Sequence, residues 1–335
     1  MIDFRSDTVT RPCKKMRNAM AEAEVGDDVY NDDPTVNDLE QWSAQNHKFE
    51  ASLFCSSGTQ ANLLALMAHC ERGDEYLCGQ QAHNYQFEGG GAAVLGSIQP
   101  QPIQNEKDGT ISLIKLKQAI KPDDSHFART KLVSIENTIN GKVLPLSYLA
   151  ELRDFVKENK LNLHLDGARV YNAATALEVD ITEITKYVDS MSICLSKGLG
   201  APIGSLLFGS NAFIAKARRW RKVLGGGMRQ AGILCAAAKI ALTDNIVKLK
   251  VDHQNAQYLA QQLNNISGIR VDIKQVVTNM VFAKIDGTID IHGIAEKLKK
   301  HDILLTPGKN MRLVTHLDIN KEKIDHFISL LKTLV

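Results

Sequence analysis

The sequence contains no long apolar run, no excess of one charge and no signal peptide. Its longest apolar stretch, residues 231–242, is broken by Lys239 and is too short to span a bilayer. The first residues, MIDFRSD, lack the apolar segment that a signal peptide requires. The 40 basic and 38 acidic residues leave a net charge of +2, which is not the charge of a nucleic-acid or membrane-surface binder. We therefore expect a soluble, cytoplasmic protein that acts on a small molecule and binds neither nucleic acid nor a membrane.

Paired cysteines are also absent. The six cysteines are scattered along the chain, and none belongs to a CxxC pair. Their spacing does not fit a zinc framework, so we predict no metal site from them. In a chain of 335 residues, unpaired cysteines indicate buried thiols in a reducing compartment.

What the sequence does contain is an alternation of short apolar runs with amphipathic stretches. Strands are predicted at residues 51–55, 75–78, 131–135, 161–165, 190–195 and 203–208, with helices at 58–70 and 148–157. This alternation predicts an α/β protein with a mainly parallel sheet covered by helices. Beyond about residue 245 shorter strands and helices alternate. We therefore expect a large domain over residues 1–245 and a small α+β domain over 246–335.

In such a sheet, functional groups follow the carboxyl ends of the strands. Lys197 follows one predicted strand and lies beside Gly198 and Gly200. A lysine there can form a Schiff base, although a solvated lysine in a turn fits the pattern too. Asp166 ends another strand and can pair with a protonated ring nitrogen, as pyridoxal phosphate requires, or simply cap a helix. We interpret His164, which alternates with leucines, as structural.

Three further features add to this pattern. The segment SSGTQAN at residues 56–62 leads from a strand into a helix, whose first turn can bind a phosphate group or be merely capped. His83 and His126 lie in predicted loops, where either can serve as an acid or base or be merely exposed. Arg312 begins a strand of the small domain and can clamp a substrate carboxylate or form a surface ion pair.

Several motifs together resemble one enzyme family along essentially the whole chain. They are DFRSDTVTRP at residues 3–12, GDDVY at 26–30, ENT at 136–138, HLDGAR at 164–169 and SKGLGAP at 196–202. The chain resembles the low-specificity L-threonine aldolases, of the aspartate aminotransferase superfamily. The resemblance implies a pyridoxal-phosphate enzyme of fold type I, with a seven-stranded sheet. It also implies a homotetramer built as a dimer of dimers that share active sites.

The resemblance also implies roles for single residues. The cofactor-binding residues would be Lys197 as the covalent attachment, Asp166 at the ring nitrogen, His83 stacked on the ring, Gly58 and Thr59 at the phosphate, and Arg169 near the 3-hydroxyl oxygen. The substrate carboxylate would be held by Ser6, in the segment 1–12, and by Arg312. His83 and His126 would lie near the substrate hydroxyl. Lys222 and Arg229 would belong to a segment that reaches a neighbouring subunit's site.

The implied reaction is cleavage of the Cα–Cβ bond of L-threonine or L-allo-threonine, which yields glycine and acetaldehyde. His83, His126 or a water molecule could remove the hydroxyl proton, and the residues do not rank them. The alternatives are a β-eliminating lyase or aminotransferase of the same fold, and a non-enzymatic scaffold. A scaffold has no need of both Lys197 and Asp166, so the pair favours an enzyme.

Overall fold

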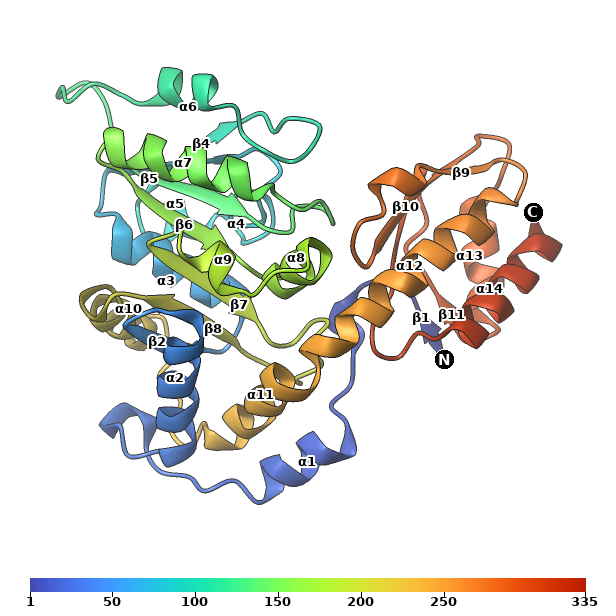
Figure 1. Cartoon of the computed structure of the whole chain (residues 1–335), viewed down its shortest axis with the longest axis horizontal. Helices are drawn as coiled ribbons and strands as arrows, with labels where there is room; N and C mark the ends of the chain where they lie inside the picture. Colours follow the sequence, from blue (N-terminus) through green and yellow to red (C-terminus); the bar gives the residue numbers. More distant parts are fainter.

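The computed structural model describes all of residues 1–335 and is built around one seven-stranded sheet (Figure 1). In spatial order its strands are β2 (Ala51–Cys55), β8 (Ser205–Gly209), β7 (Ser190–Cys194), β6 (Asn162–Asp166), β5 (Arg129–Glu136), β3 (Asp74–Gly79) and β4 (Gln99–Ile103). Strand β8 runs antiparallel to both of its neighbours, and the other pairs are parallel. The predicted α/β class and mainly parallel sheet are thus confirmed.

Helices cover both faces of this sheet. The large domain contains α1 (Lys14–Ala21), α2 (Pro34–His47), α3 (Gly58–His69), α4 (His83–Gln86), α5 (Gly91–Val94), α6 (Leu113–Ala119), α7 (Leu146–Glu158), α8 (Val170–Leu177), α9 (Thr182–Thr185), α10 (Asn211–Val223) and α11 (Gly232–Asp244), with 3-10 turns η1 (Asp7–Val9), η2 (Asp28–Tyr30) and η3 (Ile246–Lys248). Helices α8 and α9 lie on one face of the sheet and α3 on the other (Figure 1). None of the helices has the length and apolar character needed to cross a membrane.

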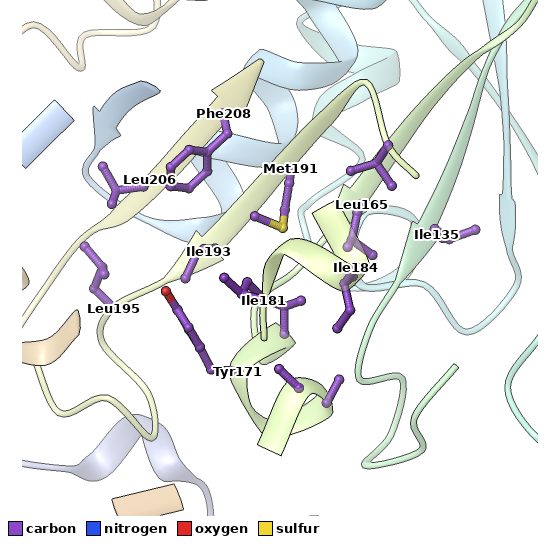
Figure 2. Packing of buried hydrophobic residues seen from close by; sticks show 14 of the residues in the cluster. Ile135, Leu165, Tyr171, Ile181, Ile184, Met191, Ile193, Leu195, Leu206 and Phe208 are labelled. Carbon is purple, nitrogen blue, oxygen red and sulfur yellow. The ribbon is translucent and has the colours of Figure 1, made fainter. Parts of the chain in front are cut away.

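The period of two along each strand produces a core on each side of the sheet. In β8, Leu206 and Phe208 pack in one cluster, whereas Leu207 packs in the cluster on the opposite face. Figure 2 shows side chains of β5, β6, β7 and β8 that meet Tyr171 of α8 and Ile184 of α9. These side chains are almost fully buried, so the core fixes the strand register and with it the positions of the residues at the strand ends.

A smaller domain begins with the long helix α12 and has its own core. Its elements are α12 (Leu249–Asn264), β9 (Ile269–Val271), η4 (Ile273–Gln275), β10 (Met280–Ile285), α13 (Ile291–Lys299), β11 (Ile303–Leu304), β12 (Asn310–Val314) and α14 (Lys321–Leu334). Strand β10 pairs antiparallel with β9 and β12. Both chain termini lie in this domain (Figure 1).

The first residues of the chain complete the small domain. Strand β1 (Ile2–Asp3) pairs with β11, and the side chains of Ile2 and Phe4 belong to the small domain's apolar core. The ring of Phe4 lies 4.9 Å from that of Phe327. The chain therefore starts in the small domain and passes directly into the large one, a crossing that the sequence pattern did not indicate.

Candidate active site

Five chain segments meet at the carboxyl edge of the central sheet. The ends of β2, β3, β5, β6 and β7 point the same way, because β2 and β7 both run antiparallel to β8. Glu136 and Asp166 are register partners at the last positions of β5 and β6. Helix α3 begins after β2, His83 follows β3, and Lys197 follows β7. The topology thus places the predicted cofactor-binding residues at one edge.

Asp166 is a buried carboxylate whose only partners are neutral N–H donors. It is 3% exposed. Its Oδ1 accepts the Ala168 N–H at 3.0 Å, and its Oδ2 accepts Asn62 Nδ2 at 2.7 Å. Because no lysine or arginine pairs with this carboxylate, it can serve as the anionic partner of a protonated heterocyclic nitrogen.

His83 lies between two other acids. Its backbone N–H donates to Glu136 Oε2 at 2.9 Å, and its Nδ1 lies 2.8 Å from Glu88 Oε1. The hydrogen bond to Glu88 raises the pKa of His83. Burial, together with the nearby Asp166, raises the pKa of Glu136 to about 8 and also raises that of Glu88. The cluster therefore contains several groups that can hold or release a proton near neutral pH.

The start of α3 provides a cradle for an anion. Ser57 caps the helix by accepting the Gln60 N–H, and the N–H groups of Gly58 and Thr59 bond to no other group of the chain. A side chain at position 58 would lie 2.6 Å from the Cys194 sulfur, so only glycine fits against β7 there. Free N–H groups at a helix N-terminus favour phosphate.

The loop that carries Lys197 is tightly packed. The Lys197 carbonyl accepts a hydrogen bond from Thr10 Oγ1 at 2.8 Å. Gly200 has a φ of +76°, and a Cβ there would lie 2.7 Å from Leu317 of the small domain. The loop is thus held between the N-terminal segment and the small domain, and the charge of Lys197 acts on the pKa values of Asp7, His83 and Glu136.

A buried ion pair ties the N-terminal segment to the site. Arg169 donates to both carboxylate oxygens of Asp7, at 2.8 and 2.6 Å. Burial alone would raise the pKa of Asp7, but Arg169 holds it well below its usual range. Asn279 of the small domain donates to the same carboxylate at 3.3 Å. One carboxylate therefore joins the N-terminal segment, the large domain and the small domain.

The two residues expected at the substrate carboxylate lie near this ion pair. Ser6 caps η1, its Oγ accepting the Thr8 N–H at 3.2 Å. Arg312 of β12 donates to the Arg5 carbonyl at 3.2 Å. Burial, together with the nearby Arg169, lowers the pKa of Arg312. The guanidinium groups of Arg169 and Arg312 thus lie near one another at the boundary between the two domains. This arrangement suits an anionic substrate.

A single chain does not bring His126 to this edge. It precedes β5, whereas Glu136 ends that strand, so about 25 Å of strand separates them. His126 is 83% exposed and bonds only to Asp124. Its position beside His83, which the resemblance implies, is not found within one chain.

Lys222 and Arg229 lie on the surface close to the start of α3. Lys222 is in the last turn of α10, and Arg229 pairs with Asp27 at 2.9 Å. A Cβ at Gly226, between them, would meet the Gln60 side chain of α3. In this chain the segment therefore borders the phosphate cradle, and both of its basic residues remain exposed.

Sequence reasoning missed the residues that surround the predicted ones. Asp7, Asn62, Glu88 and Glu136 were given no role, although all four bond directly to predicted site residues. Asp7 is adjacent to Ser6 in the N-terminal motif, and Glu88 lies five positions after His83. Asn62 lies one helical turn beyond Gly58. That spacing places Gly58 and Asn62 on one face of α3, and it is the sequence pattern from which a role for Asn62 could have been predicted.

One group of side chains has the composition of a metal site. His83, Glu88 and Asp166 each offer a ligand atom, and the three atoms lie within 4.8 Å of one another. Glu88 already accepts from His83 and Asn62, and Asp166 also accepts from Asn62. These hydrogen bonds already link the three side chains through Asn62, so the group forms a hydrogen-bonded cluster.

Comparison with known proteins places the chain in a family. A sequence model described as Beta-eliminating lyase matches residues 3–286. The chain is 54% identical over 324 residues to the low specificity L-threonine aldolase of Escherichia coli (strain K12), an alignment that covers 97% of this chain and 96% of that protein.

Two solved structures show the same fold. A threonine aldolase from Leishmania major has a TM-score of 0.84 at 23% identity, covering 100% of this chain and 99% of that one. A structure of SPT with bound PLP has a TM-score of 0.77 at 14% identity, covering 99% of this chain and 86% of that one. The family model and the close sequence relative bear out the resemblance that the motifs indicate. The chain therefore belongs to the beta-eliminating lyase family and, within it, to the low-specificity L-threonine aldolases.

Proposed function

We propose that this protein is a pyridoxal-phosphate-dependent lyase that cleaves L-threonine and L-allo-threonine to glycine and acetaldehyde. The observation that carries the proposal is the carboxyl edge of the sheet. There a buried Asp166 without a cationic partner, the Lys197 loop and the unused N–H groups of α3 meet. This set of an anion, a primary amine and an anion cradle fits the ring nitrogen, the aldehyde and the phosphate of the cofactor.

Each residue would contribute one function. Bound here, pyridoxal phosphate would supply an electron sink for the bond that breaks. Lys197 would attach it through its amine, Gly58 and Thr59 would bind its phosphate, and Asp166 would keep its ring nitrogen protonated. Arg169, fixed by Asp7, would lie beside the ring oxygen.

The choice of bond would depend on the substrate's carboxylate. Arg312 and Ser6 would bind that carboxylate from the domain boundary, and so would orient the substrate and decide which bond at Cα is broken. His83, whose pKa is raised by Glu88, is the imidazole of this chain that can accept the hydroxyl proton. Glu88 would stabilise the charged imidazole that results.

We further propose that the enzyme works in the cytoplasm as a homotetramer in which Lys222 and Arg229 reach a neighbouring subunit's site. Large apolar side chains support a subunit contact near this segment. Val223, which follows Lys222, is 71% exposed. Tyr30 is 72% exposed, and its neighbour Val29 lies beside Gly227 of this segment. Light scattering of the purified protein would measure the oligomeric state, and a monomer that is fully active would contradict the proposal.

The decisive test of the reaction is product analysis. Purified protein reconstituted with pyridoxal phosphate should release glycine and acetaldehyde from both threonine diastereomers. L-serine distinguishes the main alternative, because a β-eliminating lyase would convert it to pyruvate and ammonia. Pyruvate from serine without glycine from threonine would overturn the proposed reaction while leaving the cofactor assignment in place.

A further inference from the structure

A chain of buried polar side chains leads from the far end of α3 to Asp166. His69 Nε2 lies 2.7 Å from Ser190 Oγ, which lies 2.8 Å from His164 Nδ1. His164 Nε2 lies 3.4 Å from Asn62 Oδ1, and Asn62 Nδ2 lies 2.7 Å from Asp166 Oδ2. Apart from the half-buried His69, these residues are at most 3% exposed. A polar chain of this length inside an α/β core is expensive unless every group is satisfied.

The fold aligns these residues in two rows. His164 and Ser190 are register partners on β6 and β7, as are Asp166 and Ser192. Because strand side chains alternate, both rows face the same side of the sheet. Asn62 and His69 are seven positions apart on α3, and therefore project from one face of that helix. The helix and the two strands thus enclose the polar chain.

The orientation of Asn62 follows from its partners. Its Nδ2 donates to two carboxylates, Asp166 at 2.7 Å and Glu88 at 2.8 Å, and carboxylates accept. Its Oδ1 accepts from Ser192 Oγ at 2.8 Å. The amide nitrogen must therefore point to the acids and the amide oxygen to β6 and β7.

The direction of the remaining hydrogen bonds then follows. Burial lowers the pKa of His164 to about 4 and that of His69 to about 3, so both rings are neutral at pH 7. Asn62 Oδ1 can only accept, so His164 carries its proton on Nε2 and accepts from Ser190 on Nδ1. The hydroxyl proton of Ser190 is then used, so Ser190 Oγ accepts from His69 Nε2. Every donor along the chain points toward Asp166.

We propose that Asn62, fixed by His164 and Ser192, is a positioning residue that holds the carboxylate of Asp166 aimed at the cofactor's ring nitrogen. The inference rests on the proposed function, since it assigns the partner of Asp166. Asn62 itself touches no reacting atom. It stabilises the negative charge with an N–H donor and keeps the carboxylate of Glu88 bonded to the other N–H of the same amide, so that the two acids are held at fixed positions.

The test compares two ligands in the apoprotein: pyridoxal phosphate, and its analogue in which the ring nitrogen is replaced by C–H. Wild type should bind pyridoxal phosphate more tightly than the analogue. Asn62→Asp replaces the N–H donors with a third acid, and should weaken binding of pyridoxal phosphate by about 10- to 100-fold, the size of one lost hydrogen bond to a charged group. Binding of the analogue should change much less, because it offers Asp166 no ring N–H.

A matched pair of variants tests the chain beyond Asn62. His164→Gln keeps an N–H donor near the Nε2 position, and should retain the preference for the ring nitrogen. His164→Phe keeps an aromatic ring but has no ring nitrogen, and should lose part of that preference. Asn255→Asp, on α12 of the small domain, changes a half-buried asparagine bonded to the Ile319 carbonyl and should leave the preference unchanged.

A third measurement needs no variant. Two-bond 1H–15N correlation spectra of the wild-type apoprotein should show His164 as the neutral Nε2–H form at pH 7. Equal losses for both ligands in Asn62→Asp would mean a merely structural role and would overturn the inference, as would an Nδ1–H form of His164. A wild type that binds no pyridoxal phosphate would instead refute the proposed function. If Asn62→Asp does not fold, His164→Phe and the spectrum decide.

Discussion

Two groups of buried acids lie at opposite edges of the central sheet, and only one of them is matched by cations. At the amino edge, Asp74 and Glu75 begin β3 and are at most 2% exposed. Arg129 Nε lies 2.8 Å from Asp74, and Lys121 Nζ lies 3.6 Å from Glu75. Neutral donors satisfy further oxygens of Glu75. Each oxygen of these two acids therefore has a partner within the chain.

At the carboxyl edge the acids outnumber their partners. Glu88, Glu136 and Asp166 pair with no lysine or arginine. The imidazole of His83 contacts Glu88, and only its neutral backbone N–H donates to Glu136. The pKa of Glu136 is raised to about 8 by burial and by Asp166. An unmatched group of acids is costly to bury, and it marks the edge where a ligand is expected to supply the missing positive charge.

The largest effect should come from removing the reactive cation at the carboxyl edge. Lys197→Ala should abolish both the visible absorbance of the cofactor-loaded protein and glycine release from threonine, because no other group there can hold the aldehyde. The control is Lys121→Ala at the amino edge, which should leave turnover near that of wild type. A yellow, active Lys197→Ala protein would contradict the site assignment.

The second effect concerns Asp7, a carboxylate near the carboxyl edge that is paired with an arginine, Arg169. Asp7→Asn would leave the buried Arg169 guanidinium uncompensated, and should lower the free energy of unfolding by about 3–5 kcal/mol. Asp74→Asn should cost less, on the order of 1 kcal/mol, because its partner Arg129 is 51% exposed and remains hydrated. Denaturant unfolding of the two apoprotein variants at equal concentration measures both changes in the free energy of unfolding. Equal decreases for Asp7→Asn and Asp74→Asn would contradict the difference drawn between the two carboxylates.

The third effect is on substrate binding. Arg312→Ala should raise KM for threonine by about 10- to 100-fold, the value of a charge-assisted hydrogen bond, with a smaller change in kcat. Arg5→Ala is the control, since Arg312 bonds to the Arg5 backbone carbonyl, which this variant keeps. A change confined to kcat would show that Arg312 does not bind the ground state.

The fourth effect is a pH dependence, which is small over any single pH unit. The folded apoprotein holds a proton on Glu136 up to about pH 8, whereas the unfolded chain releases it near 4.5. Unfolding between these values releases a proton, so the free energy of unfolding should fall as pH rises, by at most about 1.4 kcal/mol per pH unit. Glu136→Gln should flatten this part of the profile. An unchanged slope would show that Glu136 is ionised throughout.

The sequence predicted those parts of the fold that local patterns determine. The alternating leucines at residues 161–165 predicted a strand, and the strand ends predicted the positions of Asp166, before a helix, and of Lys197, before Gly198 and Gly200. Strand β4 was missed because Pro100 and Pro102 interrupt it. It is an edge strand, the one place where prolines are tolerated.

Other parts depend on contacts between distant segments and have no local signal. Strand β1 has only two residues, and it is a strand because β11 pairs with it. The link from Asn62 to Asp166 joins a helix and a strand that are 104 positions apart. His126 shows the opposite problem, because the resemblance implies a place for it near the substrate, whereas in this chain it precedes β5, at the other end of that strand from Glu136.

The pairing of Ile2 with Ile303 has a consequence for how the chain folds. The ribosome makes β1 before the strands of the central sheet, yet its only strand partner emerges about 300 residues later. The central sheet can form while synthesis continues, since its strands end at residue 209. The first segment must stay unpaired until then, and closing so long a loop is slow. In the folded chain the Asp7–Arg169 pair holds this segment against the large domain, so that once the pair has formed β1 lies closer to the position of β11.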